Sequence, residues 1–133
     1  MRWRFEVPGK LPSLNEYTSA NRSNRFMGAK VKKQAEAEIL ASIGANPPRF
    51  ANRAVDIWML WVRPDMRTDK DNVCFAKKFI QDALQKAGVI ERDSWALCTP
   101  HDFGFQVNKS NPRTVVIVQD AWEPAPTAED FAE

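Results

Sequence analysis

The stretch from Arg63 to Trp95 contains one amphipathic helical pattern with acidic residues before and after it. A helix with one apolar face is predicted because seven apolar residues recur at helical spacing: Val73, Ala76, Phe79, Ile80, Ala83, Leu84 and Ala87. Gly88 follows, at a position where helix C-termini favour a left-handed residue. A helix of this kind needs an apolar partner, and we expect it to pack on a sheet.

Three other segments have the composition of strands. Residues 53–62 are largely apolar on both faces, which is typical of a central strand that is covered on both sides. Trp3 and Phe5 alternate with charged residues, so the N-terminus is predicted to be a half-exposed strand. Residues 114–119 are mostly β-branched, which favours a further strand.

The remaining segments complete the predicted architecture. One or two more strands are expected over residues 95–107, with a break near Pro100. A first helix is expected over residues 29–43, after a polar loop over residues 11–28. We therefore predict an α+β domain in which a small mixed β-sheet packs with two main helices.

The overall composition is that of a globular protein. The 133 residues suffice for one domain with a single core, and 44% of them are hydrophobic. No apolar run approaches the roughly 20 residues of a membrane helix, so no membrane partner is expected. Cys74 and Cys98 lack the spacing of a metal site, and both are expected to be reduced in a cytosol.

Charge is distributed unevenly along the chain. Residues 120–133 contain five acids and no Lys or Arg, so residues 1–119 hold all 19 basic residues against 12 acids, a net +7. A basic body of this kind fits a polyanion partner, although it also fits an ordinary solvated surface. We predict a folded domain over residues 1–119 and a disordered acidic tail over residues 120–133.

Acidic residues lie on both sides of the amphipathic helix. Asp69 and Asp71 precede it, and Glu91 and Asp93 follow it. Asp is favoured at a helix N-cap and in the first turn, so capping explains one of the early acids. If a helix end and a strand end share one side of the sheet, however, three carboxylates converge. Carboxylates grouped without His or Cys suit a hard divalent cation such as Mg²⁺.

Several motifs resemble those of the RusA family of Holliday junction resolvases, in the form found in phages and prophages. The central motifs are RTDKDN, KKFIQDALQKAGVI and ERDSW; LPSLNEY, NRFMGAKVKK and NPRTVVIV resemble flanking elements of the family. The resemblance extends over most of residues 8–119. It implies a small α+β homodimer that cuts branched DNA with Mg²⁺, or Mn²⁺, in DNA recombination and repair.

Carried over by position, the resemblance assigns metal binding to Asp69, Asp71 and Asp93. It assigns the basic catalytic residue to Lys78, four residues before the Asp of the Asp-Ala-Leu element. The gap before that element is longer than in the shortest family members, so Lys77 is a rival to Lys78. Arg92 stands where the first acid of a late Asp pair is expected. Glu91 therefore remains an alternative to Asp93 as the third acid.

Under the same interpretation, a group of basic and amide side chains is expected to contact DNA phosphates. They are Asn15, Arg22, Arg25, Lys30, Lys32, Lys33, Asn72, Lys77 and Arg113. Such a nuclease would work in a bacterial cytosol or in a phage-infected host cell.

Two other classes of function remain open. A non-catalytic module that binds branched or single-stranded nucleic acid would use the acids as caps and its aromatic residues as stacking platforms. A module that binds a protein partner through the acidic tail is the third possibility. A requirement for metal separates the nuclease from both, because a binding module does not need the carboxylates.

Overall fold

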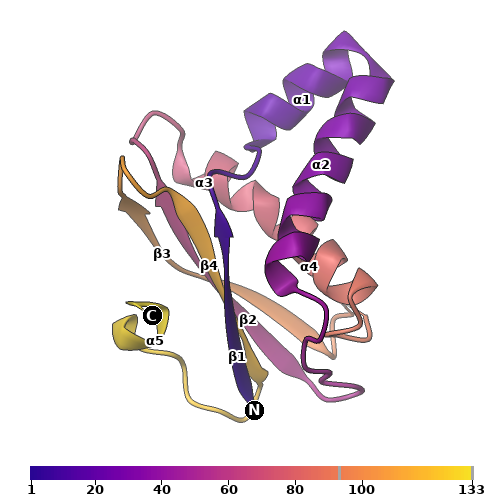
Figure 1. Cartoon of the computed structure of the whole chain (residues 1–133), viewed down its shortest axis with the longest axis vertical. Helices are drawn as coiled ribbons and strands as arrows, with labels where there is room; N and C mark the ends of the chain where they lie inside the picture. Colours follow the sequence, from indigo (N-terminus) through magenta and orange to yellow (C-terminus); the bar gives the residue numbers. More distant parts are fainter. Residues whose placement is uncertain (93, 133) are drawn as a thin grey trace.

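A four-stranded mixed sheet forms the centre of the computed structural model, which describes residues 1–92 and 94–132 (Figure 1). The strands lie in the order β1-β4-β2-β3, where β4 is antiparallel to both neighbours and β2 is parallel to β3. Their bounds are β1 Arg2–Pro8, β2 Val55–Arg63, β3 Cys98–Val107 and β4 Arg113–Asp120. The predicted α+β class with a mixed sheet is confirmed.

Strand β2 is buried on both faces, as its sequence predicts. One face contributes Ile57, Met59 and Trp61 to the main core beneath the helices. The other face contributes Leu60 and Val62 to a second, smaller core. A strand covered on both sides requires a layer of structure against each face, and the chain supplies both.

Helices α2 (Arg25–Ile43) and α4 (Lys77–Lys86) cover one face of the sheet (Figure 1). Helix α1 (Leu14–Ser23) forms a helical hairpin with α2 and extends beyond the end of the sheet. Within the described ranges, no helix combines the length and the apolar character needed to cross a membrane.

The predicted loop over residues 11–28 is wrong, because most of it is helical. Ser13 caps α1 by accepting a hydrogen bond from the Glu16 backbone N–H at 3.2 Å. Asn24 ends α1 and caps α2 through the Phe26 N–H at 2.7 Å. The same Ser and Asn residues that indicated a loop therefore act as helix caps. Helix α1 buries no side chain, so it lacks the apolar period that predicts a helix.

The amphipathic helix is divided into three parts. A short helix α3 (Lys70–Val73) and a 3₁₀ turn η1 (Cys74–Ala76) precede α4. The predicted apolar face is confirmed, since six of its seven residues are buried and Ala87 is half-buried. Gly88 has a φ of 77°, which confirms the left-handed residue after α4.

Strand β3 departs from its prediction in two ways. It is one strand that contains Pro100, and a proline is tolerated there because β3 is an edge strand. Its register against β2 shifts by one residue between Asp102 and Gly104, which is a β-bulge. Trp95, which precedes β3, is fully exposed at 101%.

The predicted disordered tail is wrong for residues 120–132. Asp120 is the last residue of β4, and α5 (Ala128–Ala132) packs on the face of the sheet opposite the other helices (Figure 1). Phe131 stacks on Phe103 of β3 with ring centroids 4.2 Å apart, and Arg4 donates to the Phe131 carbonyl at 2.9 Å. The composition of this segment predicted disorder because it contains five acids, and the contribution of the one buried aromatic ring cannot be recognised from composition.

The role of the tail in stability can be tested on Phe131. Replacing Phe131 by Ala removes a ring that is 2% exposed and is expected to reduce the free energy of unfolding by about 3 kcal/mol. Phe26→Ala is a matched control, because the Phe26 ring is 70% exposed and little stability should be lost. Urea denaturation followed by circular dichroism measures both. Equal effects of the two substitutions would show that the tail does not stabilise the fold.

Candidate active site at the ends of strands β2 and β3

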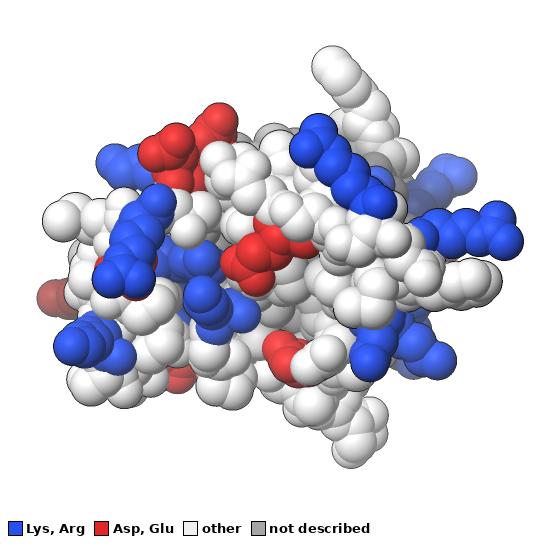
Figure 2. All heavy atoms as spheres, turned by 90° about the horizontal axis from the view of Figure 1, so that it is seen from above, with Lys and Arg blue, Asp and Glu red and all other residues white. Residues whose placement is uncertain are grey.

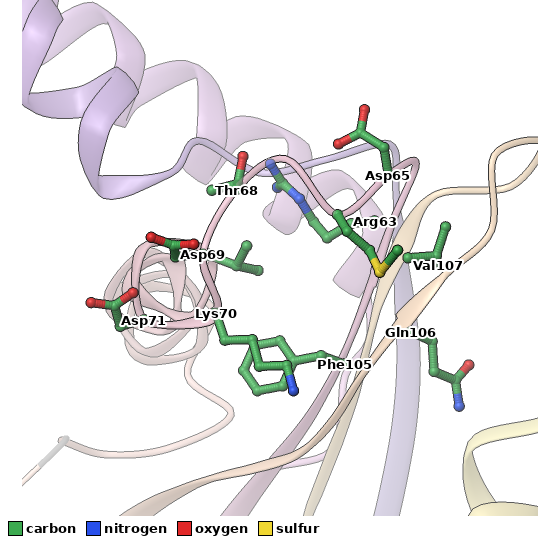
Figure 3. Close-up of a pocket in the computed structure, with 11 residues that line it drawn as sticks. Arg63, Asp65, Thr68, Asp69, Lys70, Asp71, Phe105, Gln106 and Val107 are labelled. Carbon is green, nitrogen blue, oxygen red and sulfur yellow. The ribbon is translucent and has the colours of Figure 1, made fainter.

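A cavity of about 520 Å³ opens at the C-terminal ends of the two parallel strands (Figure 3). Such ends are the usual place for ligands in sheets with parallel strands. The cavity is bounded by the end of β2, the loop over residues 64–69, α3 and the end of β3. Its lining residues are Arg63, Asp65, Met66, Thr68, Asp69, Lys70, Asp71, Val73, Phe105, Gln106 and Val107.

Asp69 and Asp71, two of the three predicted metal ligands, both line this cavity. Both are exposed, and in Figure 3 their carboxylates project from the start of α3 to the same side. Asp69 occupies the N-cap position, but its side chain makes no capping hydrogen bond. The backbone carbonyl of Asp69 instead accepts from the Asn72 and Val73 N–H groups, each at 3.0 Å. Capping therefore does not account for the Asp69 carboxylate.

A third acid at the cavity, Asp65, has a structural role. Its Oδ1 accepts from the Arg67 backbone N–H at 3.0 Å, which is a turn stabilised by the Asp side chain. This contact shapes the loop between β2 and α3. Asp65 thereby fixes the path of the chain that leads to Asp69.

Two cations line the same cavity. Arg63, at the end of β2, is buried and donates to the Leu11 carbonyl at 3.1 Å. The Lys70 ammonium lies 5.6 Å from the centroid of the Phe105 ring, which is within cation–π distance. The cavity thus combines exposed carboxylates with fixed positive charge.

Asp102 holds Lys77 in place at the start of α4; neither residue is part of the cavity lining. Its carboxylate accepts from the Lys77 ammonium at 2.8 Å and from the Trp61 indole N–H at 2.9 Å. Burial raises the pKa of the nearby Cys74 thiol, the charge of Asp102 adds to that effect, and Lys77 opposes it. Lys78, to which the resemblance assigns the role of the basic catalytic residue, is exposed. Of the two rivals, Lys77 has the fixed position.

Sequence reasoning missed Asp102. Its only signal is a single acid within the predicted strand region, which is a common feature of surface strands. Its contact with Lys77 depends on the β3 register: Asp102 pairs with Met59 before the bulge, and Phe105 pairs with Trp61 after it. The bulge directs Asp102 and Phe105 to the helix-covered face and Phe103 to the face with α5.

The late acids do not join the cavity as far as the structure describes them. The predicted third ligand, Asp93, lies outside the described residues. Glu91 is exposed and lies with Arg49 and Gly88, after the C-terminal end of α4. Asp69 and Asp71 precede the opposite end of that helix. Among residues 1–92 and 94–132, no group of three or more His, Cys, Asp or Glu side chains could hold a metal ion.

The residues expected to contact phosphates fall into three groups. Three are engaged: Lys32 pairs with Asp82 at 3.6 Å, Lys77 with Asp102 at 2.8 Å and Arg113 with Glu6 at 2.9 Å. Lys32 of α2 therefore contacts α4 through Asp82. Asn72 is half-buried in α3. The others are exposed on α1 and α2 or at their junction: Asn15, Arg22, Arg25, Lys30 and Lys33.

Figure 2 shows the end of the molecule that carries the helical hairpin. Lys and Arg side chains are distributed around a few acidic ones, and they do not form a continuous basic surface. Positive charge on this face is therefore spread among separate side chains.

Comparison with known proteins adds no assignment. No protein-family model matches the sequence, and no curated protein matches it significantly.

The pairing of Asp102 with Lys77 can be tested by chemical labelling. Asp102→Asn keeps an acceptor for the Trp61 indole but removes the charge, so the Lys77 ammonium should react faster with an acetylating reagent. An increase of about two- to five-fold is expected, which corresponds to an ion pair of about 0.5–1 kcal/mol. Mass spectrometry compares Lys77 with Lys78, which serves as the internal control. An unchanged ratio of the two labelling rates would contradict the pairing.

Proposed function

We propose that this protein is a Mg²⁺-dependent endonuclease that cuts Holliday junctions or other branched DNA as a homodimer. The observation that carries the proposal is the pair of carboxylates, Asp69 and Asp71, at a cavity that also presents Arg63 and Lys70. Neither carboxylate has a hydrogen bond or an ion pair within the described part of the chain that accounts for its position. The resemblance to RusA resolvases, which rests on motifs that include these two acids, supports the same function.

The donor set at the cavity fits Mg²⁺. This ion is commonly held by one or two carboxylates, with water and substrate phosphate completing its coordination, so a group of three acids is not required. Asp69 and Asp71 would hold the ion, and Mn²⁺ would fit the same oxygen donors. When bound, the metal would polarise the phosphate and lower the pKa of a water molecule.

The chain itself supplies positioning and positive charge. Lys77, held by Asp102, can present its ammonium at a fixed place and stabilise negative charge that develops on the phosphate. Exposed basic residues on α1 and α2 can follow the DNA backbone. A four-way junction has two-fold symmetry, so a C₂ dimer suits paired cuts in two strands.

The nuclease proposal is tested on the two early acids. Asp69→Asn and Asp71→Asn should each reduce cleavage of a synthetic four-way junction in Mg²⁺ by at least about 100-fold. Junction binding should be unchanged or tighter, because negative charge near phosphate is removed. Glu91→Gln, an equal loss of charge at the other end of α4, is the control. EDTA should abolish cleavage by the unmodified protein. Normal cleavage by either Asn variant would remove that residue from the site.

The choice between the two lysines is tested in the same assay. Lys77→Met is expected to reduce the cleavage rate by about 100-fold or more, since it removes a positioned charge. Lys78→Met should reduce it less than tenfold, because the exposed Lys78 has no fixed position. Fluorescence anisotropy measures junction binding for both variants. If Lys78→Met folds and loses more cleavage activity than Lys77→Met, the role of the basic catalytic residue belongs to Lys78.

A non-catalytic nucleic-acid-binding module is the second candidate. It is favoured by three aromatic residues that are unusually exposed: Trp95 at 101%, Trp122 at 77% and Phe26 at 70%. Exposed rings can stack on unpaired bases. Junction binding that persists without any Mg²⁺-dependent cleavage, in a protein with intact Asp69 and Asp71, would favour this candidate.

A further inference from the structure

Arg63 is a buried charge with most of its hydrogen-bonding capacity unassigned. Its residue is only 9% exposed, yet it lines the cavity. A guanidinium has five N–H donors, and one of these reaches the Leu11 carbonyl at 3.1 Å. Among the described residues, no carboxylate approaches it within the 4.0 Å of an ion pair. A buried cation in this state is unusual, because burial of a charge is costly unless an opposite charge compensates it.

The energetic consequence appears in the pKa of the group. Burial lowers the pKa of Arg63, and the charges of Glu16 and Asp65 only partly oppose that effect. The guanidinium remains protonated at neutral pH, since its ordinary pKa lies far above 7. A bound anion would therefore meet a positive charge on a side chain that is mostly withdrawn from water.

The cavity gives an anion access to this charge. Figure 3 shows the Arg63 guanidinium turned toward the loop that carries Thr68, inside the lining of the cavity. Thr68 adds a hydroxyl, and Lys70 adds a second cation to the same lining. Arg is also suited to phosphate because its planar N–H groups can bind two oxygens at once.

We propose that Arg63 is a phosphate-binding residue, which holds a backbone phosphodiester of the DNA strand inside the cavity lined by Asp69 and Asp71. This assignment rests on the proposed nuclease function and gives it a specific contact to the strand that is cut. Arg63 is thereby a binding residue at the floor of the site, distinct from the exposed basic residues on α1 and α2.

A purely structural role makes a different prediction. If Arg63 only ties the end of β2 to the Leu11 segment, its replacement should lower stability and leave anion binding unchanged. Arg63→Gln keeps an amide donor for the Leu11 carbonyl while it removes the charge. Arg63→Lys keeps the charge but loses the two-oxygen geometry. Arg49→Gln is the matched control, because Arg49 is exposed near Gly88 at the other end of β2.

The first measurement is the affinity for a synthetic four-way junction in EDTA over a range of salt concentrations. The second is thermal unfolding in chloride and in inorganic phosphate at equal ionic strength. Arg63→Gln should bind at least about tenfold more weakly, and its log–log salt slope should fall by about 0.9, the value for one lost phosphate contact. Arg63→Lys should keep the slope and lose part of the affinity. Phosphate should stabilise the unmodified protein and Arg49→Gln more than it stabilises the Arg63 variants.

The outcomes separate this inference from the nuclease proposal. Junction cleavage by the unmodified protein, with unchanged affinity and slope in folded Arg63→Gln, overturns the Arg63 assignment and leaves the nuclease standing. Phosphate stabilisation that depends on Arg63, without any binding or cleavage of the junction, supports an anion site and overturns the nuclease. If Arg63→Gln does not fold, Arg63→Lys is measured in its place. The assignment is then overturned if Arg63→Lys binds the junction as tightly as the unmodified protein and is stabilised by phosphate to the same extent.

Discussion

Burial of β2 on both faces is the constraint on which the rest of the structure depends. Its nine residues extend for about 30 Å, and their backbone groups are paired with β4 on one side and β3 on the other. Apolar side chains on each face must still be removed from water. Helices α2 and α4 achieve this on one face, and the segment that ends in α5 does so on the other. The acidic C-terminal segment is thus a structural layer, because without it the second face would be exposed.

The position of the candidate site follows from the pairing of β2 with β3. Parallel neighbours need a crossover, and here it includes the loop over residues 64–69, α3, η1 and α4. The crossover leaves β2 at the same edge where β3 ends, so the first residues of α3 lie beside the last residues of β3. Division of the helix into three parts allows α3 to carry Asp69 and Asp71 at the cavity while α4 packs its apolar face on the sheet.

Helices and strands in which apolar residues recur at regular spacing were predictable from the sequence. Those that are stabilised by single contacts were not. Strand β2 and the apolar face of α4 are recognisable because apolar residues recur along them at regular spacing. Helix α1 buries none of its residues, and its caps look like loop residues when read alone. The tail depends on Phe131, one ring in a mostly acidic segment. At the site, Asp69 and Asp71 form a local motif that is visible in the sequence. The contact of Asp102 with Lys77, 25 residues earlier, depends instead on the register of the bulged strand β3, which the sequence does not reveal.

Charge at the cavity links the two ligands that the site is proposed to take. Its lining holds three carboxylates, Asp65, Asp69 and Asp71, and two cations, Arg63 and Lys70, which gives a net charge of −1. In that state the carboxylates oppose the approach of a phosphate, and the buried Arg63 only partly offsets them. Addition of a divalent cation changes the sum to +1, so the phosphate is then attracted. Conversely, the metal alone meets repulsion from Arg63 and Lys70, which a phosphate relieves. Metal and DNA strand are therefore expected to bind cooperatively at this cavity, because each compensates the charge that opposes the other.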